Sequence, residues 1–325
     1  MCFDHMCKII GVKKMLRLTL ITNIQVFMDI ERGTGREFWH GFYNDRQVKI
    51  SDMPLLTLNE LENMVPLFRG PAGNLLAKGL MRVLEINKVN ELYDRNSIFT
   101  GPEFARHVLE DIGITYEILN AHFLEALPDG PFITISNHPY GSIDGIMLVD
   151  ILGHLRPDYK VMVNGFLSRV RTLDENFIYV TPTGEEREAP SVESIHGMRE
   201  ALAHIRNGHP LGIFPSGAVS DLSLKDGCVR DREWQEPVLR FIRKMHVPVL
   251  PIRFMDGNSA LYYSLGLIDW RVRLLKLPSE VFNKKGRRTR VEIGRIVTPQ
   301  LQDECRGLAD YGRFLRSFIY KYQSV

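Results

Sequence analysis

The chain has 325 residues, a length that corresponds to one large domain or two modest ones. Hydrophobic residues make up 44% and charged residues 25%, which is ordinary for a globular protein and excludes a disordered tail, a collagen-like fibre and a coiled-coil rod. With 41 basic and 39 acidic side chains the net charge is +2, so the composition carries no nucleic-acid signature, and attraction to anionic lipid must come from local patches.

The four cysteines are scattered without a CxxC pair, which indicates a reducing compartment and neither a disulfide framework nor a zinc site. The sequence has no run of about 18 uncharged apolar residues, so no membrane-spanning helix is predicted. The nearest candidate, residues 8–28, is interrupted by Arg17 and Asn23 and lacks a following cleavage site, which argues against a signal peptide. Its cations beside aliphatic residues are typical of a segment at a membrane surface. The segment could equally be an ordinary strand or helix, or the protein could begin at Met28.

Residues 1–113 are predicted to form an N-terminal region that is loop first and mostly helical afterwards. Residues 29–60 are polar and turn-rich. Beyond them, apolar residues three and four apart predict three helices, over residues 58–68, 73–95 and 101–113.

The second region, residues 114–325, alternates short β-rich runs with helical stretches. The predicted strands are residues 116–119, 131–136, 159–163, 177–180, 211–214, 247–254 and 290–294. The predicted helices are residues 143–155, 191–207 and 236–246, with a last helix within 301–325. This alternation predicts an α/β fold with a central, mostly parallel sheet flanked by helices, next to the small helical N-terminal region. Pro248 and Pro251 favour a strand end or a sheet edge for residues 247–254.

The first segment that carries chemistry follows the strand at residues 131–136. Asn137 and His138 come directly after it, and Asp144 stands where the next helix begins. In α/β sheets, function collects at the carboxyl ends of strands. A carboxylate that accepts the N–H of one ring nitrogen fixes the tautomer, so the other nitrogen can take a proton from a hydroxyl. The alternative is a surface histidine beside a helix-capping Asp, and a similar pair at residues 40–45 lies in loop sequence.

The second segment follows the strand that ends at Phe214. Its loop, Pro215-Ser216-Gly217, has a tight backbone that can present N–H groups to a ligand, although an ordinary turn would have the same composition. If Ser216 were a nucleophile, the protein would be a hydrolase. However, the sequence has no GxSxG elbow, and the nearest match, residues 257–261, fails at its last position.

Three sequence blocks in this order resemble those of the lysophospholipid/glycerolipid acyltransferase superfamily. They are Asn137-His138 followed by Asp144, Phe-Pro-x-Gly at 214–217, and Val-Pro-Val-x-Pro at 247–251. The run from residue 214 to 266 resembles the hemolysin-like bacterial branch, which includes O-acyltransferases that complete ornithine and glycine lipids. The resemblance covers about residues 114–300.

The resemblance implies an enzyme that transfers a fatty acyl group from a thioester of acyl carrier protein or CoA to the hydroxyl of a lyso-lipid, without a metal or other cofactor. His138 would remove the hydroxyl proton, and Asp144 would orient His138. Backbone N–H groups near Gly141 or in the 216–217 loop are expected to stabilise the oxyanion. The expected substrate-binding residues are Asn137, Gly141, Phe214, Pro215, Ser216, Gly217, Arg230 and Trp234.

Two departures from the general family pattern narrow this expectation. His138 and Asp144 have five residues between them instead of four; the branch pattern has this longer spacing, and Gly141 can absorb the added residue. The family's second block ends in an Arg at the acceptor phosphate, but Thr181 follows residues 177–180 here. This favours an amino-acid-containing lyso-lipid as acceptor. A 1-acylglycerol-3-phosphate O-acyltransferase and a non-catalytic lipid-binding protein are the alternatives.

The lyso-lipid acceptor and the product both reside in a membrane, so the predicted location is peripheral, on the cytoplasmic face of the inner membrane. Apolar residues between Leu75 and Leu84 are expected to dip into the bilayer, unless this helix packs on the α/β core. The five cations of residues 284–290 are expected to attract anionic headgroups. The same cations would also suit a solvated turn or an acidic acyl carrier protein.

Overall fold

The computed structural model describes residues 70–181, 192–268, 273 and 276–320. The chain divides into two compact units between Asn90 and Glu91. The sheet and the segments with predicted chemistry belong to the second unit, and so does the predicted helix at 101–113. The predicted helix at 58–68 and the segment 8–28 lie outside the described residues.

The predicted helix over residues 73–95 is two helices in the structure, so this prediction is wrong. They are α4 (Gly70–Val83) and α5 (Ile86–Asn96). Glu85 between them has a φ of 59°, a left-handed conformation in which a helix ends. No Gly or Pro marks the break, and the apolar spacing continues through it.

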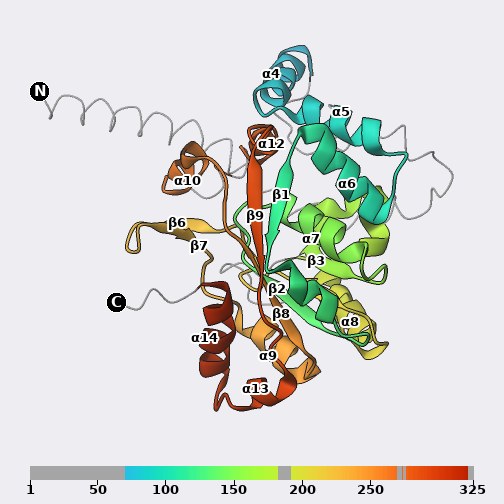
Figure 1. The fold of residues 1–325 in the computed structure, drawn as a ribbon. Helices are drawn as coiled ribbons and strands as arrows, with labels where there is room; N and C mark the ends of the chain where they lie inside the picture. The colour runs from blue at the N-terminus through green and yellow to red at the C-terminus, as the bar shows by residue number, and fades with distance from the viewer. Residues whose placement is uncertain (1–69, 182–191, 269–272, 274–275, 321–325) are drawn as a thin grey trace, which may run out of the picture. The chain divides into compact units, whose positions relative to one another are not determined.

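The second unit is built on a seven-stranded sheet with the order β1-β9-β8-β2-β5-β3-β4 (Figure 1). All neighbouring strands in this order are parallel except β8 and β9. The predicted mostly parallel α/β sheet is therefore confirmed. The strands are β1 (Thr115–Leu119), β2 (Ile133–Ser136), β3 (Lys160–Asn164), β4 (Phe177–Val180), β5 (Leu211–Ile213), β8 (Val249–Phe254) and β9 (Arg288–Ile293).

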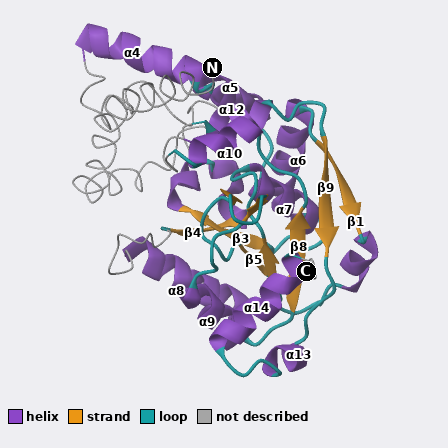
Figure 2. Ribbon diagram, turned by 90° about the vertical axis from the view of Figure 1, so that its left-hand side faces the viewer, coloured by secondary structure: helices purple, strands orange, loops and turns teal. Residues whose placement is uncertain are grey.

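Helices cover both faces of the sheet, as Figure 2 shows. Helices α6 (Gly101–Ile112) and α7 (Ile143–Gly153) pack on each other and cover one face. The other face carries α8 (Val192–Arg206), α9 (Glu236–Met245) and α14 (Leu308–Ile319). The short helix α13 (Pro299–Asp303) precedes α14, and 3-10 turns lie at Ala121–Ala126, Gly165–Arg169 and Arg171–Asn176.

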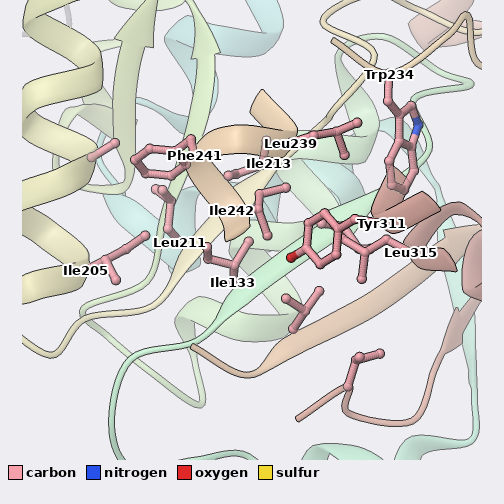
Figure 3. Packing of buried hydrophobic residues seen from close by; sticks show 14 of the residues in the cluster. Ile133, Ile205, Leu211, Ile213, Trp234, Leu239, Phe241, Ile242, Tyr311 and Leu315 are labelled. Atoms are coloured by element: carbon pink, nitrogen blue, oxygen red, sulfur yellow. The ribbon is translucent and has the colours of Figure 1, made fainter. Parts of the chain in front are cut away.

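The alternating side chains of β2 explain how the two layers are held. Ile133 and Ile135 are fully buried in the main core with residues of α8, α9 and α14 (Figure 3). Thr134 faces the opposite layer, where its hydroxyl lies 2.7 Å from the hydroxyl of the fully buried Tyr159. A strand buried on both faces is rich in apolar and β-branched residues, which is why the sequence pattern located it.

Pro248 directly precedes β8, as predicted for a strand end, but Pro251 lies inside a strand between β9 and β2, so the prediction is wrong for Pro251. Pro251 is in register with Ile135 of β2, and its carbonyl faces β9, where it accepts the N–H of Gly294 at 2.7 Å. The pairing of β8 with β9 ends at Ile252, which pairs with Ile293, and resumes at a bridge between Val249 and Val297. Between these two pairs the β9 side has one more residue than the β8 side. The proline nitrogen therefore faces a bulge, where no ladder hydrogen bond is lost.

Four further elements were missed by the sequence analysis. A hairpin of β6 (Asp221–Ser223) and β7 (Cys228–Arg230) follows the loop after β5. Helix α10 (Ala260–Gly266) follows β8, and α12 (Leu277–Phe282) precedes β9. Two of these elements matter for the site, because Tyr263 of α10 and Leu277 of α12 lie against the loop that carries His138.

Candidate active site

The carboxyl ends of β8, β2 and β5 meet at one edge of the sheet, because these neighbouring strands are parallel. Asn137 ties the first two ends together: its amide accepts the N–H of Phe254 at 2.8 Å and donates to the Phe254 carbonyl at 2.8 Å. The His138 ring packs on Phe214 at the end of β5, with ring centroids 4.1 Å apart. The structure thus brings together the strand-end loops that the sequence singled out.

His138 and Asp144 form a close pair in this loop cluster. Nδ1 of His138 lies 2.7 Å from Oδ2 of Asp144, although the ring N–H is not aimed along the line between the two atoms. The Asp144 side chain is completely buried, whereas the His138 side chain is 16% exposed. The pair therefore has a buried carboxylate and an imidazole with one accessible edge, which is the arrangement that a general base requires.

The loop from Pro139 to Gly141 wraps around the Asp144 carboxylate. The N–H of Tyr140 lies 3.1 and 3.2 Å from its two oxygens, and the N–H of Gly141 lies 3.4 Å from Oδ2. Asp144 stands in the first turn of α7, where the helix dipole also favours a negative charge. Gly141 has a φ of +90°, and a Cβ there would lie 2.9 Å from a methyl of Leu277, so the wrap requires glycine.

This wrap changes the expectation for the oxyanion donors. The Gly141 N–H is directed at Asp144, and the Gly217 N–H donates to the Phe214 carbonyl at 3.0 Å. These two N–H groups belong to the alternative loops expected to face the oxyanion, and in the structure both are directed at acceptors within the protein. Two peptide groups of the His138 loop thus direct their N–H groups at the carboxylate that pairs with His138.

The outer side of the same loop is held by residues that follow β8. The hydroxyl of Tyr263 donates to the Pro139 carbonyl at 2.9 Å. The amide of Asn258 donates to the Tyr140 carbonyl at 3.1 Å. The segment 256–259 follows β8, and Asn258 in it is turned toward the His138 loop.

The backbone of His138 is fixed by a second buried carboxylate, Asp231. The His138 N–H donates to Oδ1 of Asp231 at 3.2 Å, and Ser220 donates its hydroxyl to the same oxygen at 2.6 Å. The Ser220 N–H in turn donates to the His138 carbonyl at 2.9 Å. Burial raises the pKa of Asp231 above its usual value, and these hydrogen bonds oppose that rise. The Asp231 N–H donates to the hydroxyl of Tyr320 at 2.8 Å, which connects α14 to the site.

The other predicted substrate-binding residues have partners of their own. Ser216 is buried and donates its hydroxyl to the Ala218 carbonyl at 2.8 Å, and the Pro215 carbonyl accepts the N–H of Gln235 at 3.0 Å. Trp234 belongs to the main core (Figure 3), and its indole N–H donates to Asp231 at 3.4 Å. Arg230 pairs with Asp226 at 2.8 Å and lies over the ring of Tyr320. Arg230 and Trp234 are therefore linked to His138 through Asp231.

The cationic run at 284–290 is not a uniform surface patch, and the prediction for Lys284 is wrong. Its side chain is 1% exposed, and its Nζ donates to Asn258 Oδ1 at 2.6 Å and to the Glu280 carbonyl at 2.7 Å. Arg288 pairs with Glu117 at 3.4 Å, and Arg290 pairs with Asp256 at 2.7 Å. Lys285 and Arg287 are exposed.

A shallow hollow of about 370 Å³ lies beside the loop cluster, between β6 and α10. It is lined by Asp221, Leu222, Arg232, Tyr263, Gly266, Leu267 and Ile268. Tyr263 lines this hollow and also donates its hydroxyl to the Pro139 carbonyl in the His138 loop. Within the described residues there is no group of three or more His, Cys, Asp or Glu side chains placed to hold a metal ion. No helix in the described part of the chain is long and apolar enough to cross a membrane.

Comparison with known proteins identifies the family. A family model described as acyltransferase matches residues 66–323. The chain belongs to this acyltransferase family. The match confirms the resemblance inferred from the three sequence blocks.

Two curated relatives are similar over most of their length, and both are named lyso-glycine lipid O-acyltransferase. The protein from Bacteroides thetaiotaomicron is 24% identical over 251 residues, which are 74% of this chain and 88% of the relative. The protein from Phocaeicola vulgatus is 25% identical over 251 residues, 74% of this chain and 85% of the relative. Among solved structures, the 1-acyl-sn-glycerophosphate acyltransferase PlsC from Thermotoga maritima aligns with a TM-score of 0.41 and 15% identity, covering 76% of this chain and 93% of PlsC.

Several residues that hold the site were not identified as part of it from the sequence. Local signals exist for some: Glu280 precedes Lys284 by four residues, and Ser259 begins α10 as a capping residue. The contacts of Asn258 and Tyr263 with the His138 loop, and of Tyr320 with Asp231, depend on tertiary structure alone. No spacing in the sequence shows them.

Proposed function

We propose that this acyltransferase moves a fatty acyl group from an acyl thioester to the hydroxyl of a lyso-lipid. The observation that carries the proposal is the pair formed by His138 and the buried Asp144, at the edge of the sheet where three strand ends meet. A thioester is already activated, so the acceptor hydroxyl can attack it directly and no acyl-enzyme is required.

In the proposed mechanism, His138 is the general base. Its Nδ1 faces Asp144, which leaves Nε2 as the nitrogen that takes the proton of the acceptor hydroxyl. The hydroxyl oxygen forms a bond to the thioester carbonyl carbon, and the tetrahedral intermediate then collapses with cleavage of the carbon–sulfur bond. The proton held by His138 passes to the departing thiolate. Asp144 stabilises the imidazolium that exists between these steps.

The acceptor that we propose is an amino-acid-containing lyso-lipid of the lyso-glycine type. Both curated relatives carry lyso-glycine lipid O-acyltransferase as their names. In this chain Thr181 follows β4, where the resemblance would place an Arg for an acceptor phosphate. An acceptor without a phosphate monoester needs no such bidentate cation.

The test is acyl transfer by the purified protein, with the labelled acyl group supplied as a thioester of acyl carrier protein or of CoA in separate reactions. Lyso-glycine lipid and lysophosphatidate are offered as separate acceptors. We expect labelled diacyl product from lyso-glycine lipid and its loss in His138→Ala, while His122→Ala, at an exposed histidine, keeps full turnover. Product from His138→Ala at the wild-type rate would contradict the mechanism, and saturable lipid binding without any product would identify a binding protein.

We also propose that the enzyme works while bound peripherally to the cytoplasmic face of the inner membrane, since its acceptor and product are lipids. Leu75 on α4 is 74% exposed and Lys285 and Arg287 are exposed, so they can contact a bilayer and its anionic headgroups. Charge reversal at both cations should weaken binding to anionic vesicles at low salt and leave binding to neutral vesicles unchanged. Equal binding to both vesicle types at every salt concentration would refute the electrostatic part.

A further inference from the structure

Lys284 is a buried cation directly behind the loop that carries His138. Its side chain is 1% exposed, and Nζ donates to Oδ1 of Asn258 at 2.6 Å, to the Glu280 carbonyl at 2.7 Å and to Oδ1 of Asn283 at 3.2 Å. Oε2 of Glu280, which is also 1% exposed, lies 3.7 Å away. The ammonium group is thus fully coordinated by the protein, so it has no capacity left to bind a ligand.

The bond to Lys284 fixes the orientation of the Asn258 amide. Because Oδ1 faces the ammonium group, Nδ2 faces the loop, where it donates to the carbonyl of Tyr140 at 3.1 Å. That carbonyl belongs to the same peptide group as the N–H of Gly141, which is directed at Asp144 at 3.4 Å. A continuous chain of polar groups therefore runs from a buried cation to the buried carboxylate beside His138.

The neighbouring peptide group is held in a parallel way. Its carbonyl, on Pro139, accepts the Tyr263 hydroxyl at 2.9 Å, and its N–H, on Tyr140, donates to both oxygens of Asp144. Tyr263 also accepts the backbone N–H of Asn258 at 3.1 Å, so one segment after β8 controls both peptide groups. The ammonium group of Lys284 lies 5.2 Å from the centroid of the Tyr140 ring, which adds a cation–π contact to the same loop.

We infer that Lys284 is a positioning residue for acyl transfer: through Asn258 and the Tyr140–Gly141 peptide group, it holds the Asp144 carboxylate against His138. Hydrogen bonds in such a chain polarise one another, so the positive charge of Lys284 at one end strengthens the hydrogen bond to the negative charge of Asp144 at the other. The negative charge of Asp144 also acts on Lys284, where it opposes the lowering of the lysine pKa by burial. This inference rests on the proposed role of His138 as the general base.

Two variants separate positioning from stability. Lys284→Met removes one of the two cations beside the buried Glu280 and leaves only Lys276, at 3.4 Å, so this variant can lose stability. Asn258→Ala breaks the chain at its middle and leaves Lys284 with Glu280 and Asn283, so this variant is expected to fold. Lys244→Met, at an exposed lysine of α9, is the matched control.

The expected result for Asn258→Ala is a fall in kcat of roughly 10- to 100-fold with unchanged KM for donor and acceptor, because misplacement of the dyad affects the chemical step. In the folded Lys284→Met protein the same fall is expected. The double variant should lose no more than Asn258→Ala alone, because both changes break one chain. Unchanged kcat in folded Asn258→Ala, or losses that multiply in the double variant, would overturn the inference.

A second measurement does not depend on turnover. The Gly141 amide resonance, observed by NMR in labelled protein, should move in Asn258→Ala and not in Lys244→Met, since only the first change releases the Tyr140–Gly141 peptide group. A Gly141 resonance that stays in place would overturn the inference even if turnover falls. If the wild-type protein makes no product while this resonance moves, the chain from Lys284 to Asp144 is supported and the proposed function fails.

Discussion

Substitution of Asp231 tests how the backbone of His138 is held. The Asp231 side chain is 3% exposed. Its Oδ1 accepts the His138 N–H and the Ser220 hydroxyl, and its Oδ2 accepts the Trp234 indole N–H at 3.4 Å. Asp231→Ala removes all these acceptors, whereas Asp231→Asn retains the Oδ1 position and removes only the charge and the weakest bond.

The expected magnitudes follow from the donors that each variant leaves unpaired. A buried donor without an acceptor costs about 1–3 kcal/mol. Loss of the two hydrogen bonds to Oδ1 in Asp231→Ala should therefore lower the free energy of unfolding by about 2–6 kcal/mol. That is a large part of the ~5–15 kcal/mol typical of a native protein. Asp231→Asn loses one long bond, worth about 1 kcal/mol, and is relieved of a buried charge. We expect it to remain within about 1–2 kcal/mol of the wild type.

The pH dependence of stability shows whether the charge of Asp231 stabilises or destabilises the fold. Because burial raises the pKa of Asp231 above 3.8, the native state keeps this proton to higher pH than the unfolded state does. The contribution of Asp231 to stability is therefore complete below its unfolded pKa and is lost as pH rises through its folded pKa. An asparagine cannot ionise, so the stability of Asp231→Asn relative to the wild type should improve from pH 4 to pH 7.

The assay is urea unfolding, with the midpoint and the m-value of each variant measured at both pH values. Asp129→Asn, at an exposed aspartate, is the control. Asp231→Ala should shift the midpoint strongly at constant m. If Asp231→Asn is as unstable as Asp231→Ala, or if its relative stability worsens toward pH 7, then the carboxylate charge itself stabilises the fold and the reasoning fails.

Three further predictions concern the surroundings of the His138 loop. Gly141→Ala, at a φ of +90° and with its Cβ 2.9 Å from a leucine methyl of α12, should destabilise the protein by about 2–4 kcal/mol and reduce turnover, measured by urea unfolding and acyl transfer. Arg273→Met should cost about 3–5 kcal/mol by urea unfolding, because this arginine is 2% exposed and binds the carbonyls of residues 219–220 and the Asp221 carboxylate. Burial lowers the pKa of Lys284 to about 8, so turnover should decline as the pH rises through that value and Lys284 loses its charge. Between that pH and its unfolded pKa of 10.5, the unfolded state holds the proton and the folded state does not, so the contribution of this group to stability increases with pH. A pH–kcat profile of Lys284→Met that keeps the alkaline decline of the wild type would contradict this prediction.

The strands and most helices of the second unit could be predicted because their side-chain patterns reflect burial directly. The run at residues 131–136 is rich in apolar and β-branched residues because the strand is covered on both faces, and β2 occupies Ile133–Ser136 within it. The pairing of His138 with Asp144 was also predictable, since the two residues lie on either side of one strand-to-helix turn. The β6–β7 hairpin was missed even though Asp226-Gly227, with Gly227 at a φ of +63°, marks its turn.

The burial of Lys284 could not be predicted because the local sequence points the other way. Five cations in seven residues are typical of a solvated turn, and the structure buries one of them. The acceptor for its ammonium group, Asn258, lies 26 residues away in the sequence, and the ring that it faces belongs to Tyr140. Hydrophobic periodicity reports which residues are apolar, but it carries no information about a polar residue that is buried together with its partners.

The support of the dyad suggests that effects on turnover should follow the number of hydrogen bonds from His138, not the distance along the chain. Tyr320 is 182 residues from His138 in sequence, yet two hydrogen bonds join them through the backbone and carboxylate of Asp231. General-base catalysis is sensitive to small displacements of the base. The Tyr320 hydroxyl, at the end of α14, holds Asp231 beside the backbone of His138, while Asn258 and Lys284 hold the loop around Asp144. Residues far apart in the sequence therefore position the two members of the dyad. The sequence motifs therefore bring His138 and Asp144 together, and contacts that reach as far along the chain as Tyr320 fix the backbone around this pair.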